Sequence, residues 1–508
     1  MLHLIPTERA LRLVQSASDF DVRALAGSDA ALVLIDQEQT TRALAALPYS
    51  TVWRRLHGVV SERGEPGVLA ARVPNERLTL MAVGFLKRNA TAFERLSLAG
   101  RLWKEVAAAQ PARVLVAAPG IGQGMREPAL EALVAAALAG DAPMPDLRSK
   151  PQTRTNISTL RVLRGAHSLS LDVTRAVQSG NHLARWLTAL PPNHLHATAY
   201  RGALRRLAKR EGWHYGFLDE RALEKLGAGA FLSVARANAH RGAGIVRLKY
   251  RPGGERTPPE LTLVGKGICF DTGGINLKPH KSMYQMHEDM QGSAVAVGTL
   301  LALSRLHMDY AIDCWLAITE NEVGPRAYRP QEVVTAANGV TIQVVHSDAE
   351  GRMALADTLA LAARERPRLI IDYATLTGAC VTALTDRYSG VFTNRAPLLP
   401  TLQAAGGDSG ERVWGFPLDP DFDSDLESSL ADVLQCAVDG KGDHILAARF
   451  LSRFVDQETP WIHLDLAASN RRGGLAHVPT DVTGFGVRYS AWLLQRPELH
   501  EILARPRR

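Results

Sequence analysis

The run Leu261-Thr-Leu-Val-Gly-Lys-Gly-Ile-Cys-Phe-Asp271, followed by Thr272-Gly-Gly274, joins a strand-like apolar stretch to an acidic residue and a glycine turn. Strands of a parallel sheet are buried on both faces and read as nearly continuous apolar runs, so this stretch predicts a central strand. Ligands of such sheets gather beyond the carboxyl ends of the strands. Asp271 therefore marks the edge at which we expect a functional site.

Further apolar runs alternate with helical patterns on the C-terminal side. The strand candidates are Leu261–Phe270, Ala311–Thr319, Thr341–Val345, Leu369–Asp372 and Trp461–Leu466, and the helical patterns lie at Gly292–Leu306 and Gly351–Arg364. This alternation predicts a mostly parallel sheet sandwiched by helices.

The first part of the chain predicts a separate, smaller α/β domain. Apolar runs at Ala31–Ile35 and Arg113–Ala118 alternate with alanine- and leucine-rich stretches such as Pro128–Ala139. Periodicity fades and prolines accumulate between Asp141 and Thr155, which predicts a linker. A helical stretch over about Leu171–Leu190 should connect the halves. We expect an α/β protein with an N-terminal domain over residues 1–160 and a catalytic domain over residues 161–508, the connecting helix lying at about 170–190.

Composition narrows the class of protein. The chain has 508 residues with 46% hydrophobic and 22% charged content, typical of globular domains, and two domains are the default expectation at this length. No apolar run long enough for a membrane span occurs, and the first residues do not resemble a secretory signal. Its four cysteines (Cys269, Cys314, Cys380, Cys436) are widely spaced. We expect a cytoplasmic protein with buried, reduced thiols.

Positive charge is concentrated near the N-terminus. Residues 1–185 hold 23 of the 59 Lys and Arg residues but only 16 of the 52 Asp and Glu residues, so the remainder holds 36 of each. The basic residues are scattered without a long run, which favours a solvated or subunit-contacting face with an oligomeric or regulatory role. A nucleic-acid contact remains the alternative interpretation.

Four acidic residues are the candidates for a catalytic metal site. Asp271, Asp289, Asp348 and Glu350 fall in two short runs. Carboxylates held a few ångströms apart repel, and divalent cations remove that cost while supplying a hydrolytic reaction. The sequence therefore predicts a two-metal hydrolase. If residues 348–352 are extended, their alternate side chains also project to one side, although Asp-x-Glu alone is equally a helix cap.

Two lysines accompany the acids. Lys266 lies between two glycines in a strand predicted to be buried, either as the ion-pair partner of a carboxylate or as a neutral amine on a metal, which requires a lowered pKa. Lys278, beside Pro279, is the candidate for a charged group that polarises a substrate oxygen.

These runs resemble the leucyl (cytosol) aminopeptidases. The motifs are Val264-Gly-Lys-Gly with Phe270-Asp-Thr-Gly-Gly274, Glu288-Asp-Met290 and Ser347-Asp-Ala-Glu-Gly-Arg352, joined by Arg326–Pro330, Asp372–Gly378, His463–Asp465 and Thr483–Gly486. The resemblance covers roughly Leu183 to Leu494.

The resemblance implies a role for each residue. Asp271 and Glu350 would bridge two divalent ions (Mn²⁺ or Zn²⁺), with Lys266 and Asp289 completing the tighter site and Asp348 the looser one. Lys278 would stabilise the oxyanion, and Arg352 would hold a bicarbonate that relays a proton. The first side chain of a peptide with a free N-terminus would lie among Met286, Thr375, Gly378 and Ala467, with the Leu376 backbone contacting substrate. A homohexamer without membrane association is also implied.

Several residues depart from the family pattern. His346, Ser347, Gln291 and Ala468 replace the family's asparagine, threonine, glycine and glycine, which puts the usual leucine preference in doubt. His280 and His287 are interpreted as structural or exposed rather than as ligands. The competing hypotheses are a phosphoester or amide hydrolase with the same metals, and a DNA-binding regulator acting through the basic N-terminal domain.

Overall fold

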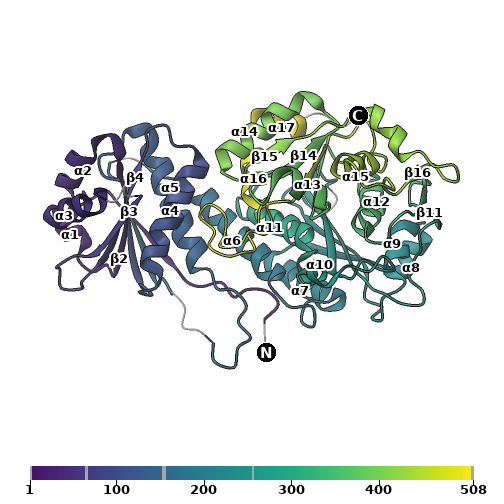
Figure 1. Cartoon of the computed structure of the whole chain (residues 1–508), viewed down its shortest axis with the longest axis horizontal. Coiled ribbons are helices and arrows are strands. Elements are labelled where there is room, and N and C mark those ends of the chain that lie inside the picture. The colour runs from purple at the N-terminus through teal and green to yellow at the C-terminus, as the bar shows by residue number, and fades with distance from the viewer. Residues whose placement is uncertain (1–2, 63–66, 152–155, 167, 255–256, 505–508) are drawn as a thin grey trace.

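The protein consists of two α/β units joined by a helix (Figure 1). The computed structural model describes residues 3–62, 67–151, 156–166, 168–254 and 257–504. The α/β class and the parallel-rich architecture expected from the sequence are confirmed. Within the described part of the chain, no helix combines the length and apolar character needed to span a membrane.

The N-terminal unit is built on a six-stranded sheet with the order β1-β6-β5-β2-β4-β3, in which only the β3–β4 pair is antiparallel. Apolar clusters cover both of its faces. Its elements are β1 (Arg12–Ser16), α1 (Val22–Leu25), β2 (Ala30–Asp36), η1 (Gln37–Gln39), α2 (Thr40–Ala46), α3 (Ser50–Ser61), β3 (Val68–Arg72), β4 (Leu80–Leu86), α4 (Ala92–Ala107), β5 (Arg113–Ala117), α5 (Gln123–Asp141) and β6 (Thr159–Leu163). The division expected between residues 160 and 161 falls inside β6.

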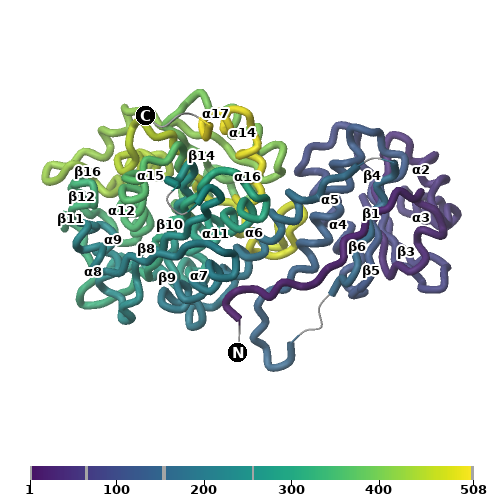
Figure 2. The backbone as a smooth tube through the Cα atoms, turned by 180° about the vertical axis from the view of Figure 1, so that it is seen from behind, coloured from purple at the N-terminus to yellow at the C-terminus, as the bar shows by residue number. Residues whose placement is uncertain are grey.

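The two units meet along a helix. The predicted connecting helix is present as α6 (Asp172–Thr188), which packs against α5 of the N-terminal unit and against the larger unit. An N-terminal segment also crosses between the units, because Trp186 donates to the carbonyl of His3 while β1 belongs to the smaller sheet (Figure 2). The predicted linker lacks helix and strand over residues 142–151, and its residues 152–155 lie outside the described part.

The larger unit contains an eight-stranded sheet with the order β15-β14-β17-β13-β9-β10-β8-β7. Its centre, β17-β13-β9-β10, is parallel, and antiparallel pairs flank it. Its strands are β7 (His214–Asp219), β8 (Gly244–Tyr250), β9 (Leu261–Asp271), β10 (Ile312–Asn321), β13 (Leu369–Ala374), β14 (Ser389–Thr393), β15 (Val413–Gly415) and β17 (Trp461–Asp465).

Helices cover both faces of this sheet, each over its own apolar core. The bounds of the helices are α7 (Ala197–Glu211), α8 (Glu220–Lys225), α9 (Gly229–Ala235), α10 (His280–Met283), η2 (Met286–Glu288), α11 (Gln291–Arg305), α12 (Glu350–Ala363), α13 (Gly378–Leu384), η3 (Ala396–Leu398), α14 (Leu399–Ser409), η4 (Pro420–Leu426), α15 (Asp443–Ser452), α16 (Val487–Leu493) and α17 (Pro497–Ala504). All four cysteines are buried and free, as predicted.

One predicted strand belongs to a different sheet. The run Thr341–Val345 was expected beside the central strands, but β12 (Thr341–Gln343) pairs with β11 (Val333–Thr335) and β16 (Val433–Leu434) in a separate three-stranded sheet. An apolar run indicates a strand, but its partners are chosen by long-range packing that the run does not encode. The prediction of its place was therefore wrong.

Candidate active site

A cavity of about 530 Å³ opens beyond the carboxyl ends of the central strands. All twelve predicted site residues line it, although they come from segments up to about 200 residues apart. They are Lys266, Asp271, Lys278, Met286, Asp289, Asp348, Glu350, Arg352, Thr375, Leu376, Gly378 and Ala467. The structure thus brings the whole predicted set together.

Lys266 lies between two acids on the floor of the cavity. Its ammonium nitrogen is 2.8 Å from both carboxylate oxygens of Asp289 and 3.2 Å from Oε1 of Glu350, and it donates to the Thr375 carbonyl at 2.7 Å. The lysine is 3% exposed. Burial opposes its charge, but the surrounding carboxylates dominate and raise its pKa above the ordinary value.

Lys278 occupies the matching position between the other two acids. Its ammonium nitrogen is 2.8 Å from Asp271 and 2.5 Å from Asp348. Asp271 also accepts bonds from the Gly273 amide at 2.8 Å and from Asn321 Nδ2 at 2.9 Å. Burial again opposes the charge of Lys278, and the acids outweigh it, so its pKa is raised.

The acids fit a site for divalent cations. One carboxylate oxygen from each of Asp271, Asp348 and Glu350 lies within 4.8 Å of the others. Burial and neighbouring carboxylates raise the pKa of Asp289 to about 7 and that of Asp348 to about 6, and they also raise the pKa of Glu350. Crowded oxygens that resist ionisation are the donor set that a hard or borderline dication stabilises.

Two glycines permit close packing here, Gly351 beside the Lys266 side chain and Gly265 where α11 packs against β9. A Cβ on Gly351 would lie 2.5 Å from the Cε atom of Lys266, and a Cβ on Gly265 would lie 2.5 Å from the Ser293 backbone. Gly351 is therefore needed for the close passage of the lysine.

The segment at 348–352 is not extended. Ala349 is the N-cap of α12 and Glu350 is its first residue, so the condition under which alternate side chains would project to one side is not met. Asp348 and Glu350 still meet, because the chain turns between them, whereas the guanidinium of Arg352 is directed at Asp443 on α15. A helix does begin here, but Asp348 does not cap it, because the N-cap is Ala349 without a side-chain cap bond and Asp348 pairs with Lys278. The cluster of acids arises from tertiary packing.

The predicted substrate-binding residues lie on the wall formed by η2, α13 and the segments after β13 and β17. Asp465, at the end of β17, anchors this wall by accepting the amides of Leu376 and Thr377 at 3.2 and 3.4 Å and the Thr377 hydroxyl at 2.6 Å. Neither His280 nor His287 lines the cavity, and His346 is exposed.

Two residues that hold the acids in place were not singled out from the sequence. Asn321, at the end of β10, donates hydrogen bonds to Asp271 and to the Ser347 carbonyl. Gln435 accepts the amides of Val345 and His346 at 3.0 Å and donates to the Ala349 carbonyl at 3.1 Å, so it holds the loop that carries Asp348. A polar residue at a strand end was a usable signal for Asn321, but Gln435 offered none.

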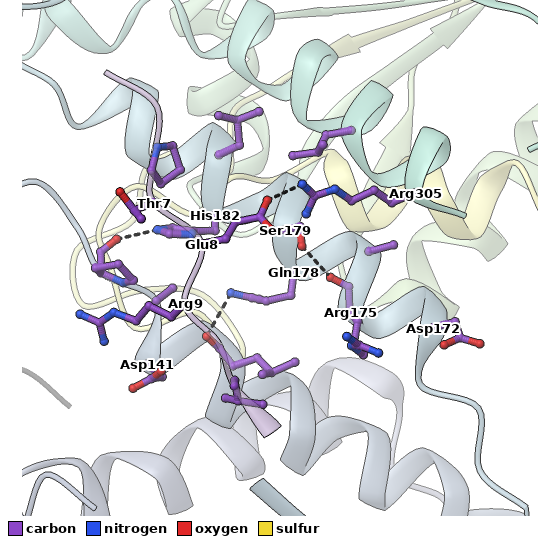
Figure 3. Close-up of a pocket in the computed structure, with 18 of the residues that line it drawn as sticks. Thr7, Glu8, Arg9, Asp141, Asp172, Arg175, Gln178, Ser179, His182 and Arg305 are labelled. Atoms are coloured by element: carbon purple, nitrogen blue, oxygen red, sulfur yellow. Dashed lines mark hydrogen bonds and ion pairs between the residues drawn. The ribbon is translucent and has the colours of Figure 1, made fainter. Parts of the chain in front are cut away.

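A second cavity, of about 580 Å³, lies where the two units meet and contains none of the predicted residues (Figure 3). Several of its polar groups are satisfied internally: Arg305 pairs with Glu8 and Glu211, and His182 bonds the Pro143 carbonyl at 2.6 Å. The acidic cluster of the first cavity has no counterpart among the residues that line this one.

Comparisons with known proteins point to one family. The family model described as "Cytosol aminopeptidase family, catalytic domain" matches residues 182–491. A "Probable cytosol aminopeptidase 1" of Shewanella oneidensis is 34% identical over 493 residues, covering 94% of this chain and 96% of that protein. A "Probable cytosol aminopeptidase" of Stutzerimonas stutzeri is 42% identical over 295 residues, which span 58% of this chain and 59% of that protein.

Solved structures share the fold along nearly the whole chain. The "Bottromycin maturation enzyme BotP in complex with Mn" has a TM-score of 0.78 and 29% identity, and the match covers 92% of this chain and 99% of that one. A tomato leucine aminopeptidase mutant has a TM-score of 0.83 and 24% identity, covering 97% and 98%, and this likeness concerns the fold. Taken with the arrangement of the twelve site residues, these matches show that the chain belongs to the cytosol aminopeptidase family.

Proposed function

We propose that the protein is a metal-dependent aminopeptidase that releases the N-terminal residue of peptides. The observation that carries the proposal is the meeting of four carboxylates and two lysines from four segments of the chain in one cavity at the edge of the sheet. Such a cluster is costly to bury without a function. Membership of the cytosol aminopeptidase family supports the same reaction class.

Two divalent ions would be held by Asp271 and Glu350 in common, by Lys266 and Asp289 on one side and by Asp348 on the other. Bound ions of this kind acidify water, polarise the scissile carbonyl and hold the free amine of the peptide. A dication near Lys266 would lower its pKa, opposite to the effect of the carboxylates alone. The oxygen-rich donor set accepts Mn²⁺ or Zn²⁺, and the manganese complex of BotP supports the former.

The remaining residues orient the substrate. Lys278 projects a positive charge into the cavity beside Asp271 and Asp348, where it would stabilise an oxyanion developing on the scissile carbonyl. Met286, Gly378 and Ala467 also line the cavity and would receive the first side chain, and the Leu376 backbone would contact the peptide.

No specific observation favours either competing hypothesis, the DNA-binding regulator or the phosphoester or amide hydrolase. Arginines of the basic N-terminal unit lie in ion pairs with neighbouring acids, such as Arg77 and Arg113 with Asp29 and Arg88 with Asp36, which favours a solvated face over a nucleic-acid contact. Among the lining residues, Arg352 is the one arginine at the cavity, whereas a phosphoester hydrolase would call for an arginine cluster. The homohexamer and the cytoplasmic location stay predictions.

The proposal is tested by hydrolysis of a panel of aminoacyl reporter substrates and their N-acetylated counterparts. We expect turnover of free-amine substrates alone, loss of turnover after chelation and recovery with Mn²⁺ or Zn²⁺. Undiminished hydrolysis by protein shown by elemental analysis to be metal-free would overturn the mechanism, and equal cleavage of acetylated substrates would overturn the exopeptidase assignment.

A further inference from the structure

The anion beside Arg352 is a part of this chain. Arg352 is 2% exposed, and its Nη2 lies 2.8 Å from both carboxylate oxygens of Asp443. Its Nη1 donates to the Gln435 carbonyl at 3.2 Å. Asp443 is the first residue of α15, and α15 packs against α12, which carries Arg352. The packing of these two helices therefore brings Arg352 and Asp443 together.

A free oxyanion does not fit the same guanidinium. Arginine recognises carboxylate-like anions through paired N–H donors, and here the donors of Nη2 already serve Asp443 while Nη1 serves a carbonyl. The donors left over are the buried Nε–H and one N–H of Nη1. They do not form a pair, because each paired face of a guanidinium includes Nη2, which Asp443 occupies. A bicarbonate placed there would meet the carboxylate of Asp443, and two anions of like charge at such distances repel. The bicarbonate that the family resemblance implies therefore does not fit the residues around Arg352.

We propose that Asp443 takes the place of bicarbonate on Arg352, so that the enzyme neither binds nor requires that ion. A carboxylate and a bicarbonate are both planar, singly charged oxyanions, so Asp443 can balance the arginine as a free ion would. Asp443 is thus a positioning residue: it orients and neutralises Arg352 at the wall of the cavity. This inference builds on the proposed aminopeptidase function, but its binding test is independent of turnover.

The proposal predicts that Asp443→Ala loses activity and that a small added oxyanion restores it. Asp443→Ala leaves the buried guanidinium without its anion and opens a space of the size of a small oxyanion. We expect hydrolysis in bicarbonate-free buffer to fall about 10–100-fold, as for other residues that support an active-site group. Added bicarbonate or formate should restore it in a saturable manner, whereas the rate of the unmodified enzyme should not respond to either ion.

Binding is measured separately by ¹³C NMR of labelled bicarbonate with each protein. We expect saturable binding to the Asp443→Ala variant and none to the unmodified enzyme or to Asp443→Asn, whose amide fills the space. Asp439→Ala is the matched control, because Asp439 is exposed and forms its ion pair with the exposed Lys441. It should behave like the unmodified enzyme in both measurements.

Saturable bicarbonate binding by the unmodified enzyme, or a rate that rises with bicarbonate, would overturn the inference. So would a folded Asp443→Ala variant that neither binds the ion nor recovers with it. If Asp443→Ala does not fold, the response of the unmodified enzyme decides alone. Absence of hydrolysis by every protein would count against the proposed function, while the NMR titrations would still decide whether Asp443 replaces the ion.

Discussion

Lys266 and Asp289 form a buried ion pair in which the ammonium nitrogen lies 2.8 Å from each carboxylate oxygen. The same nitrogen lies 3.2 Å from Glu350, so one cation compensates two acids at the floor of the cavity. Removing one partner of a buried pair leaves an uncompensated charge, which is far more costly than the net gain from forming the pair.

Lys266→Met should therefore destabilise the protein in chelator. We expect a loss of about 3–5 kcal/mol in the free energy of unfolding, measured by urea titration. Saturating Mn²⁺ should recover part of the loss, because a dication can neutralise the acids that the lysine leaves. Lys281→Met, at an exposed position of α10, is the control and should unfold like the unmodified protein. Equal stability of the two variants in chelator would contradict the role of the pair.

Glu350→Gln should lose metal and turnover together while the protein stays folded. The amide keeps the shape of the side chain but removes the charge shared between Lys266 and the acidic cluster. Since loss of a residue that only supports a ligand weakens binding by about 10–100-fold, loss of a ligand should exceed that range. Isothermal titration with Mn²⁺ and circular dichroism check the prediction, and Glu224→Gln, exposed on α8, serves as the control. Full metal binding by the Glu350 variant would remove Glu350 from the ligand set.

Asn321→Ala tests a residue that supports the acids without belonging to them. Its amide nitrogen bonds Asp271 at 2.9 Å and the Ser347 carbonyl at 3.0 Å, so it joins the two loops of the site. We expect the Kd for Mn²⁺ to rise about 10–100-fold with little change in the melting temperature of the metal-loaded protein. Asn338→Ala, exposed and bonded to the Arg453 carbonyl, should leave the Kd unchanged.

Gly298→Ala should weaken the packing that joins the connecting helix to the larger unit. A Cβ at Gly298 on α11 would lie 2.5 Å from the carbonyl oxygen of Gly180 on α6, so the two helices would have to separate. Overpacking of this kind costs about 1–3 kcal/mol. The matched control is Gly202→Ala on α7, where the nearest atom is 3.6 Å away and helix propensity predicts a gain of up to about 1 kcal/mol. Urea unfolding of both variants separates the two effects, and equal stability would refute the close crossing.

His182 should make stability depend on pH. This histidine lines the cavity between the two units (Figure 3). Burial, followed by the charge of Arg185, lowers its pKa from the ordinary 6.5 to about 4. The unfolded chain therefore binds a proton between pH 6.5 and 4 that the folded chain does not, so this contribution to stability is complete above pH 6.5 and is lost as the pH falls towards 4. His182→Gln should flatten the decline in the free energy of unfolding over that interval, and His500→Gln, exposed on α17, should not. The prediction would be contradicted if the free energy of unfolding fell with pH equally in the unmodified protein, His182→Gln and His500→Gln.

The sequence by itself determined the central strand ending at Asp271 and the helices α6, α11 and α12, and it predicted the residues that the structure brings together in one cavity. Apolar periodicity and glycine placement are local, and the motifs carried the identities of the acids and lysines. It could not determine which sheet Thr341–Gln343 joins, nor that Gly351 makes room for Lys266, because both depend on segments distant in the chain.

Only the tertiary structure decided what faces Arg352. Asp443 lies 91 residues beyond it, in a stretch without a recognisable motif, and the pair forms because α12 and α15 pack side by side. The same holds for Asn321 and Gln435, which hold the acids from other segments. Residue types and local spacing thus set the chemistry that is available, whereas long-range packing sets the partner and charge balance of each group.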